Sequence, residues 1–298
     1  MGQNPSVTVI GRKRASPSIF DFQWTRKARG AKLWHRHRGT TMKLATNHFK
    51  KAIAAGQKQI GLWVTLADGL TAELVAGAGF DWVVIDTEHS PGDGMDTAAQ
   101  LQAFAGRSTS VFVRPAWNNA VEIKRLLDMG AQGLVIPMVQ SVEEAKAAVA
   151  ATRYPPRGNR GFAGGTRATG FGRITDYVAR IEDELVVILQ LESAQAIAHA
   201  DEIAALDGVD GIFFGPADIA ADLGHLGKPM HADVWAMINP VMKRLTENGT
   251  PCGTLVIDPT AAIDLLNDGF TFVITGTDAI IFARAVDGVA AQVRTGIA

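Results

Sequence analysis

The sequence of 298 residues contains a single cysteine, Cys252. One cysteine excludes an intramolecular disulfide, and no combination of Cys and His has the spacing of a zinc motif. A reducing compartment is the default for such a chain, so we predict a cytoplasmic protein. No apolar run approaches the roughly 20 residues that cross a bilayer, and no secretory hydrophobic region is present. We therefore expect no membrane as a partner.

A large excess of charge of one sign is also absent, because the formal net charge is -1. The charges are nevertheless unevenly placed: residues 1–41 hold nine Lys or Arg and one acid, Asp21. The remainder of the chain is therefore acidic, and an acidic body is a poor binder of nucleic acid. We expect no nucleic acid as a partner of that body.

The basic stretch over residues 1–41 shows no lasting helical or strand period. Three interpretations compete: a disordered arm that touches nucleic acid, an Arg-rich targeting segment, or upstream sequence read from a start that is not the native one. The third is favoured, with Met42 as the natural beginning, because an amphipathic pattern begins only at Leu44. We predict that residues 1–41 are a disordered basic extension and that residues 42–298 form one domain.

The rest of the chain alternates between short apolar runs and helical patterns. Unbroken runs rich in Val, Ile and Leu are typical of strands that are buried on both faces. A helical pattern follows each strand candidate, as over residues 142–152, 194–205, 259–267 and 278–294. The eight strand candidates are Ile60–Thr65, Trp82–Ile85, Val111–Arg114, Gly133–Pro137, Leu185–Leu191, Gly211–Phe214, Gly253–Ile257 and Phe272–Thr275.

Strict alternation of strand and helix requires parallel strands joined by right-handed crossovers. Eight such units in about 250 residues match a closed (β/α)8 TIM barrel, so this α/β fold is the prediction. A doubly wound open sheet is the runner-up, but the Gly-rich phosphate loop that it needs after an early strand is not present. Residues 153–173 interrupt the alternation with prolines and glycines, which indicates a functional loop or an interface element.

Polar residues collect where the predicted strands end, which is where such a barrel places its active site. A carboxylate can fix the tautomer and basicity of a nearby imidazole, so His89 with Asp86 behind it could move a proton. The alternative for this stretch is a solvated polar loop. The residues at the strand ends are Asp86, Glu88 and His89 after the second strand, Arg114 in the third, Gln190 and Glu192 at the fifth, and Gly215 to Asp218 after the sixth.

Glu192 and Asp218 lie at neighbouring strands, so their carboxylates would converge at the mouth of the barrel. Two acids brought together need a cation or a shared proton. Oxygen ligands, with water and substrate in the remaining positions, suit Mg²⁺ or Mn²⁺. The alternative is that Glu192 caps the next helix or pairs with an arginine. As a pair, the two acids favour a divalent metal site.

Arg114 lies between an apolar run and Pro115, so its guanidinium is expected to be partly buried and to need an anion. That anion is either Glu88, in a structural ion pair, or a substrate carboxylate. A metal and an arginine together favour an anionic 2-oxo acid as the ligand. Arg114 would then stabilise the enolate oxygen, and backbone N–H groups from Gly215 to Asp218 would hold the carboxylate.

Other histidines and the lysines provide no competing site. A Schiff-base mechanism needs a lysine at a strand end, and the lysines of the body fall in predicted helices or loops. The remaining histidines lie in helical or loop stretches without matching acids, and we interpret them as surface residues. They include His199, His225 and His231.

Six collinear segments carry a resemblance to a known family. They are Ile-Gly-Leu-Trp (60–63), Gly-Phe-Asp-Trp-Val-Val-Ile-Asp-Thr-Glu-His (79–89), Val-Arg-Pro (113–115), Arg-Tyr-Pro-Pro-Arg-Gly (153–158), Leu-Gln-Leu-Glu (189–192) and Gly-Pro-Ala-Asp (215–218). Together they resemble the HpcH/HpaI aldolase family, over residues 44 to about 294. The resemblance implies a (β/α)8 barrel, a divalent metal, and reversible cleavage of a 2-oxo-4-hydroxy acid to pyruvate and an aldehyde.

The resemblance also implies roles for individual residues. Glu192 and Asp218 would be ligands of Mg²⁺, Mn²⁺ or Co²⁺, Arg114 would anchor pyruvate, and His89 with Asp86 would be an acid/base dyad. Loop 162–172 and Leu255 would line the aldehyde pocket. The full set of substrate contacts would be Arg114, Gln190, Gly215, Ala217, Asp218, Trp63 and Leu255.

The family is typically a homohexamer, a trimer of dimers with exchanged terminal helices, and the resemblance implies such an oligomer here. Residues 1–41 have no counterpart in the family. Two other functions compete with a pyruvate aldolase. One is a lyase for malyl- or citramalyl-CoA thioesters on the same scaffold, and the other is a protein that merely binds an acidic ligand.

Overall fold

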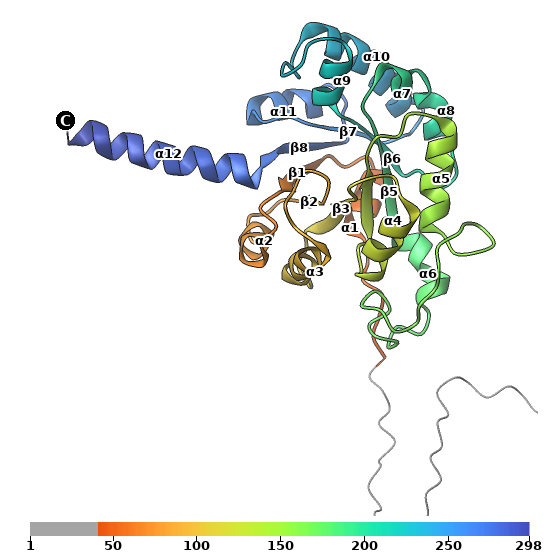
Figure 1. Ribbon diagram of the computed structural model, residues 1–298. Coiled ribbons are helices and arrows are strands. Elements are labelled where there is room, and N and C mark those ends of the chain that lie inside the picture. The colour runs from red at the N-terminus through yellow and green to blue at the C-terminus, as the bar shows by residue number, and fades with distance from the viewer. Residues whose placement is uncertain (1–40, 298) are drawn as a thin grey trace, which may run out of the picture. The chain divides into compact units, whose positions relative to one another are not determined.

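The computed structural model describes residues 41–297. They form a closed barrel in which eight parallel strands pair in sequence order, with β8 returning to β1 (Figure 1). The predicted barrel is therefore confirmed, whereas the predicted disordered extension lies outside the described residues apart from Thr41. The strands are β1 (Gln59–Val64), β2 (Trp82–Asp86), β3 (Ser110–Arg114), β4 (Gly133–Ile136), β5 (Val186–Leu191), β6 (Gly211–Phe214), β7 (Cys252–Leu255) and β8 (Phe272–Thr277).

Helices connect the strands, and most of them surround the barrel. Within residues 41–297, no helix combines the length and the apolar character that crossing a membrane requires. The helices are α1 (His48–Ala54), α2 (Gly69–Ala76), α3 (Gly94–Ala103), α4 (Ala120–Asp128), α5 (Val142–Thr152), α6 (Tyr177–Glu184), α7 (Ala194–Ala198), α8 (Ala200–Ala204), α9 (Pro216–Asp222), α10 (Ala232–Glu247), α11 (Pro259–Asn267) and α12 (Asp278–Gly296).

Aromatic side chains fill the interior of the barrel. Trp82, Phe112 and Phe272 come from β2, β3 and β8, and Phe49 of α1 packs among them. The Phe49 ring centroid lies 5.0 Å from Trp82, 4.8 Å from Phe112 and 5.5 Å from Phe272, in tilted or edge-to-face contacts that favour ring pairs. The Phe49 N–H donates to the hydroxyl of Ser110, the first residue of β3. α1 therefore closes the N-terminal end of the barrel.

Glycines opposite these rings make room for them. A Cβ at Gly253 would lie 2.0 Å from the ring of Phe272, and a Cβ at Gly133 would lie 2.4 Å from the ring of Phe112. Both distances are far below van der Waals contact. The interior is thus filled by pairing a large ring with a missing side chain, which is a common way to pack a small barrel.

The last helix, α12, leaves the barrel instead of packing along it (Figure 1). Its first residue, Asp278, is buried and accepts hydrogen bonds of 2.8 Å from both the N–H and the hydroxyl of Thr65. Beyond Asp278, exposed apolar side chains share one face of α12, as their helical spacing requires: Phe282, Val286, Val289 and Val293. On the barrel itself, two apolar residues of α2, Leu70 and Leu74, are also exposed.

Loop 162–172 corrects one expectation, because it lies at the N-terminal end of the barrel, away from the aldehyde pocket that it was expected to line. Arg167 donates to the carbonyl of Met129, which follows α4. The loop lines a cavity of about 510 Å³ together with Ser110, at the start of β3. The reason is topological: a segment that leads from a helix into the next strand must return to the end at which strands begin.

Candidate active site

The C-terminal ends of the strands bring the predicted side chains to one rim. Asp86 ends β2 and Arg114 ends β3, and the parallel register places these residues directly opposite each other. Gln190 lies on β5 and Glu192 follows this strand. Asp218 comes from the first turn of α9, after β6, and β5 pairs with β6.

Two carboxylates and one indole hold the Arg114 guanidinium. Its Nε and Nη2 donate to the two oxygens of Asp86, both at 2.8 Å, and its Nη1 lies 2.8 Å from Oε2 of Glu88. Near the end of β1, the Trp63 ring centroid lies 4.6 Å from the Arg114 Cζ atom. Only 9% of the Arg114 side chain and 1% of the Asp86 side chain are exposed. A guanidinium fixed in this way can recognise a planar oxyanion in one orientation.

Burial and charge act in opposite directions on the two acids beside Arg114. Burial alone would raise the pKa of Asp86, but the hydrogen bonds and charge of Arg114 outweigh it and hold this pKa below its usual value. For Glu88 burial prevails, so its pKa is raised despite Arg114 and His89, and the nearby carboxylates of Asp86 and Asp218 add to the rise. Asp86 is therefore a permanent counter-charge, whereas Glu88 takes up a proton more readily.

Glu192 is buried next to two other acids. Burial, opposed by the N–H of Met138, combines with the charges of Asp218 and Glu88 to raise the pKa of Glu192 to about 8. Its Oε2 accepts a 2.8 Å hydrogen bond from the Met138 N–H, and its Oε1 accepts one from the amide of Gln190. Glu192 thus lacks a cationic partner among the described residues, and its negative charge is unfavourable unless a cation is added.

These residues fit a divalent cation. Burial, together with the charges of Asp218 and Glu88, favours a proton on Glu192, and a cation bound by Glu192 and Asp218 would favour two carboxylates instead. Two carboxylates that leave other positions open are a donor set for Mg²⁺ or Mn²⁺. The buried Oε1 of Gln190 also lacks a hydrogen-bond partner in the part of the chain described, as an acceptor that meets a ligand would.

The segment after β6 is a helix, which is absent from the predicted elements. α9 is seven residues long and begins with Pro216 at a position where a missing N–H costs nothing. Gly215 just before it is buried, and a Cβ there would lie 2.8 Å from Cγ of Glu192. Ala217 and Asp218 are exposed. The close passage of Gly215 places the start of α9, and with it Asp218, beside the Glu192 carboxylate.

His89 stands apart from its predicted partner. The His89 side chain is 71% exposed, and its ring lies 4.0 Å from Oε1 of Glu88. Asp86 accepts a 3.4 Å hydrogen bond from the backbone N–H of His89 instead of from its ring. The predicted dyad contact is not formed in residues 41–297, because Arg114 occupies both oxygens of Asp86. An acid/base role for His89 stays a prediction.

Leu255, at the end of β7, is half-buried at the same rim.

Two further residues contribute more than sequence reasoning indicates. Glu88 forms the ion pair with Arg114 that was its structural alternative, and its charge also raises the pKa of Glu192. Met138 has a positive φ of 53° and directs its N–H to Glu192. A lone methionine after a strand gives no sequence signal for such a contact.

Comparisons with known proteins agree with this fold. The family model for HpcH/HpaI aldolase/citrate lyase matches residues 59–285. A pyruvate aldolase of Rhizobium etli is 48% identical over 254 residues, which cover 85% of this chain and 100% of that protein. A 4-hydroxy-2-oxo-heptane-1,7-dioate aldolase of Escherichia coli is 44% identical over 247 residues, covering 83% and 94%.

A solved structure of an HpcH/HpaI aldolase/citrate lyase family protein from Burkholderia cenocepacia is similar in fold. The TM-score is 0.81 and the identity 36%, over 84% of this chain and 100% of that one. Sequence and fold therefore agree over most of the described residues. The chain belongs to the HpcH/HpaI aldolase/citrate lyase family.

Proposed function

We propose that the protein is an aldolase that reversibly cleaves a 2-oxo-4-hydroxy acid to pyruvate and an aldehyde, with the help of a divalent metal ion. Membership of the family and the aldolase names of two relatives support a carbon–carbon lyase. The observation that carries the proposal is a fixed guanidinium beside crowded acids at one rim of the barrel. These residues are Arg114, Asp86, Glu88, Glu192 and Asp218.

Glu192 and Asp218 would hold the metal ion. When bound, Mg²⁺, Mn²⁺ or Co²⁺ supplies Lewis-acid stabilisation of the negative charge that develops on the substrate. The raised pKa of Glu192 supports this assignment, because the site is short of positive charge. The amide of Gln190 and the backbone from Gly215 to Ala217 would contact the 2-oxo acid.

Arg114 would stabilise the keto oxygen as it becomes an enolate oxygen. A guanidinium has five N–H groups. Those on Nε and Nη2 donate one hydrogen bond each to Asp86, whereas Glu88 forms an ion pair with Nη1. The second N–H of each terminal nitrogen remains for a substrate oxygen. Trp63 would act only by supporting Arg114, because it is 4% exposed. Leu255 would border the aldehyde portion.

His89 would move the proton. In cleavage, the imidazole removes the proton from the 4-hydroxyl group while the C3–C4 bond breaks and its electron pair forms the enolate. The aldehyde leaves, and a proton returned to C3 completes pyruvate. The exposed His89 ring lies on the loop after β2 and is not committed to a buried partner. Asp86 would position both Arg114 and the backbone of His89.

The proposal includes a homo-oligomer, namely a hexamer built as a trimer of dimers. The uncovered apolar face of α12 and the exposed Leu70 and Leu74 support an exchange of α12 between subunits. Among the residues described, Asp278 is the only residue of α12 that is buried. A cytoplasmic location rests on the single cysteine.

Pyruvate release from a panel of 2-oxo-4-hydroxy acids tests the proposed activity. Pyruvate is followed by coupling to lactate dehydrogenase, before chelation, after chelation, and after adding Mg²⁺, Mn²⁺ or Co²⁺. We expect activity to disappear with the chelator and to return with the metal. Unchanged activity after chelation would contradict the metal. Preferred cleavage of malyl- or citramalyl-CoA would favour the thioester lyase, and binding without turnover would favour a binding protein.

A further inference from the structure

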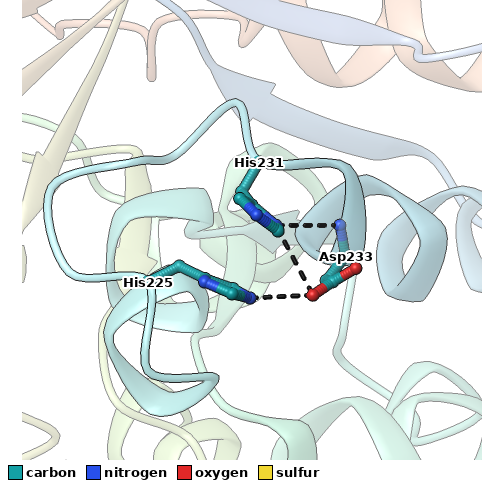
Figure 2. A group of neighbouring side chains, drawn as sticks. All are labelled: His225, His231 and Asp233. Carbon is teal, nitrogen blue, oxygen red and sulfur yellow. Dashed lines mark hydrogen bonds and ion pairs between the residues drawn. The ribbon is translucent and has the colours of Figure 1, made fainter.

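A second group of potential metal ligands lies outside the candidate active site. His225 belongs to the connection between α9 and α10, and His231 and Asp233 lie at the start of α10 (Figure 2). One ligand atom of each residue lies within 4.8 Å of those of the other two. The interpretation of both histidines as lacking a matching acid is therefore wrong, because the turn before α10 folds both rings onto Asp233.

Both imidazoles face the same carboxylate oxygen. Nε2 of His225 lies 2.8 Å from Oδ2 of Asp233, and Nδ1 of His231 lies 3.5 Å from that atom. The rings are stacked, with centroids 3.6 Å apart and 18° between their planes. Stacking holds the two nitrogens side by side. An ion that binds Nδ1 of His231 would replace the hydrogen bond that this nitrogen accepts from the Asp233 N–H.

Helix capping explains only part of this geometry. Nδ1 of His231 accepts a 3.2 Å hydrogen bond from the Asp233 N–H and so caps α10. Such a cap contributes about 1 kcal/mol, and Ser, Asn or Asp serves it at least as well. Capping gives no reason for a second imidazole, from His225, to stack on the first and approach the same oxygen. A shared ligand accounts for both rings.

We propose that His225, His231 and Asp233 form a binding site for a borderline transition-metal dication such as Zn²⁺, separate from the proposed active-site metal. Two imidazole nitrogens and one carboxylate oxygen suit Zn²⁺, Co²⁺, Ni²⁺ or Cu²⁺, whereas Mg²⁺ prefers oxygen ligands alone. Side-chain exposures of 26%, 34% and 62% allow an ion to enter from solvent. Three protein ligands leave one tetrahedral position for solvent.

The site joins two helices of which one carries Asp218. α9 has Asp218 in its first turn and ends at Asp222, shortly before His225 in the sequence. An ion bound by His225 and by the start of α10 would fix the end of α9 to α10. The expected role is a brace that stabilises this helix pair, which does not depend on the proposed aldolase activity.

Calorimetric titration of the full chain with ZnCl₂ tests the site. The parent protein carries Glu192→Gln, so that the active-site acids cannot bind the ion together. We expect one Zn²⁺ per chain and a loss of affinity of at least tenfold in His225→Ala and in His231→Asn, which keeps a capping side chain. The matched controls are His199→Ala and the double variant His35→Ala/His37→Ala, which change histidines outside the proposed site. Unchanged affinity in His225→Ala, or lost affinity in a control alone, would overturn the site.

Cu²⁺ bound to the same parent gives a second readout that reports the ligand atoms. Electron paramagnetic resonance should show coupling to two imidazole nitrogens, reduced to one in His225→Ala. Circular dichroism checks that each variant is folded. A spectrum without nitrogen coupling, or one that is the same in the parent and in His225→Ala, would overturn the assignment.

Discussion

Arg114 and Asp86 face each other across β3 and β2 and are joined by two N–O contacts of 2.8 Å. Arg244 and Asp201 form a similar bidentate pair, with contacts of 2.9 Å and 2.7 Å. The pairs differ in exposure, which is 9% and 1% for the first and 48% and 48% for the second. The chain therefore contains a buried ion pair and a matched exposed one.

The first prediction compares these two pairs. Asp86→Asn should lower the free energy of unfolding by about 3–5 kcal/mol, because a buried guanidinium loses its main counter-charge. Asp201→Asn should lower it by less than about 1 kcal/mol, because solvent screens the exposed pair. Urea unfolding at neutral pH measures both changes. Equal losses in the two variants would contradict the difference that burial implies.

The second prediction concerns the pH dependence of stability without metal. The pKa of Glu192 is raised to about 8 in the folded chain, whereas an unfolded glutamate has a pKa of about 4.3. The folded state therefore binds this proton more tightly, and the free energy of unfolding should fall as the pH rises from about 4.3 to about 8.

Glu192→Gln should remove that part of the pH dependence and should raise the melting temperature of the metal-free protein above pH 8. Thermal melting of chelator-treated samples from pH 5 to pH 9 is the measurement. Glu143→Gln changes an exposed acid and should leave the profile as it is. If Glu192→Gln is less stable than the parent at high pH, burial and the neighbouring acids do not destabilise the ionised carboxylate as described.

The third prediction links the same proton to metal binding. Because Mn²⁺ must displace the proton from Glu192, its affinity should rise by about tenfold per pH unit below pH 8 and level off above. Calorimetry in two buffers with different ionisation enthalpies should find close to one proton released per ion at pH 7 and close to none at pH 9.5. Release that does not depend on pH would argue against Glu192 as a ligand.

The fourth prediction concerns the free N–H groups of Arg114. Arg114→Lys should lower kcat by about 10²–10³, because an ammonium cannot hold both acids and also donate in the same plane. Arg114→Ala should lower activity further, and added guanidinium ions should restore part of it. Arg244→Lys, at the exposed pair, should keep full activity. Undiminished pyruvate release by Arg114→Lys would remove the enolate-stabilising role.

The fifth prediction concerns α12 and the size of the assembly. Val286→Asp together with Val289→Asp places two charges on the apolar face and should give a smaller particle. Ala291→Asp introduces a charge on the opposite face of α12 and should leave the particle size unchanged. Light scattering after gel filtration measures the mass. A parent protein that is a monomer, or a doubly charged variant of unchanged mass, would contradict assembly through this face.

Most strands were predictable, because they are apolar runs that the barrel buries on both faces. The bounds of one strand, Gly211–Phe214, and of two helices, Val142–Thr152 and Pro259–Asn267, are the predicted ones. Short helices were less predictable. α9 has only seven residues and starts with Pro216, so its sequence has too few turns to show a period.

The rim of the candidate site was predictable, since the ends of parallel strands meet at one side of a barrel. The partners within it were not, because several pairings fit the same positions: Asp86 can meet His89 or Arg114, and only the register of β2 and β3 selects Arg114. Contacts made by connections were the least predictable. His225 reaches Asp233 through a turn whose course no local pattern specifies.

The plug formed by Phe49 has a kinetic consequence. Because α1 seals one end of the barrel, a substrate that binds at the rim of Arg114 and the products formed from it must use the same opening. The two products would then leave by one route. Pyruvate, which would lie deeper, beside Arg114, would dissociate last. Its dissociation would then limit the rate at which the next substrate molecule binds.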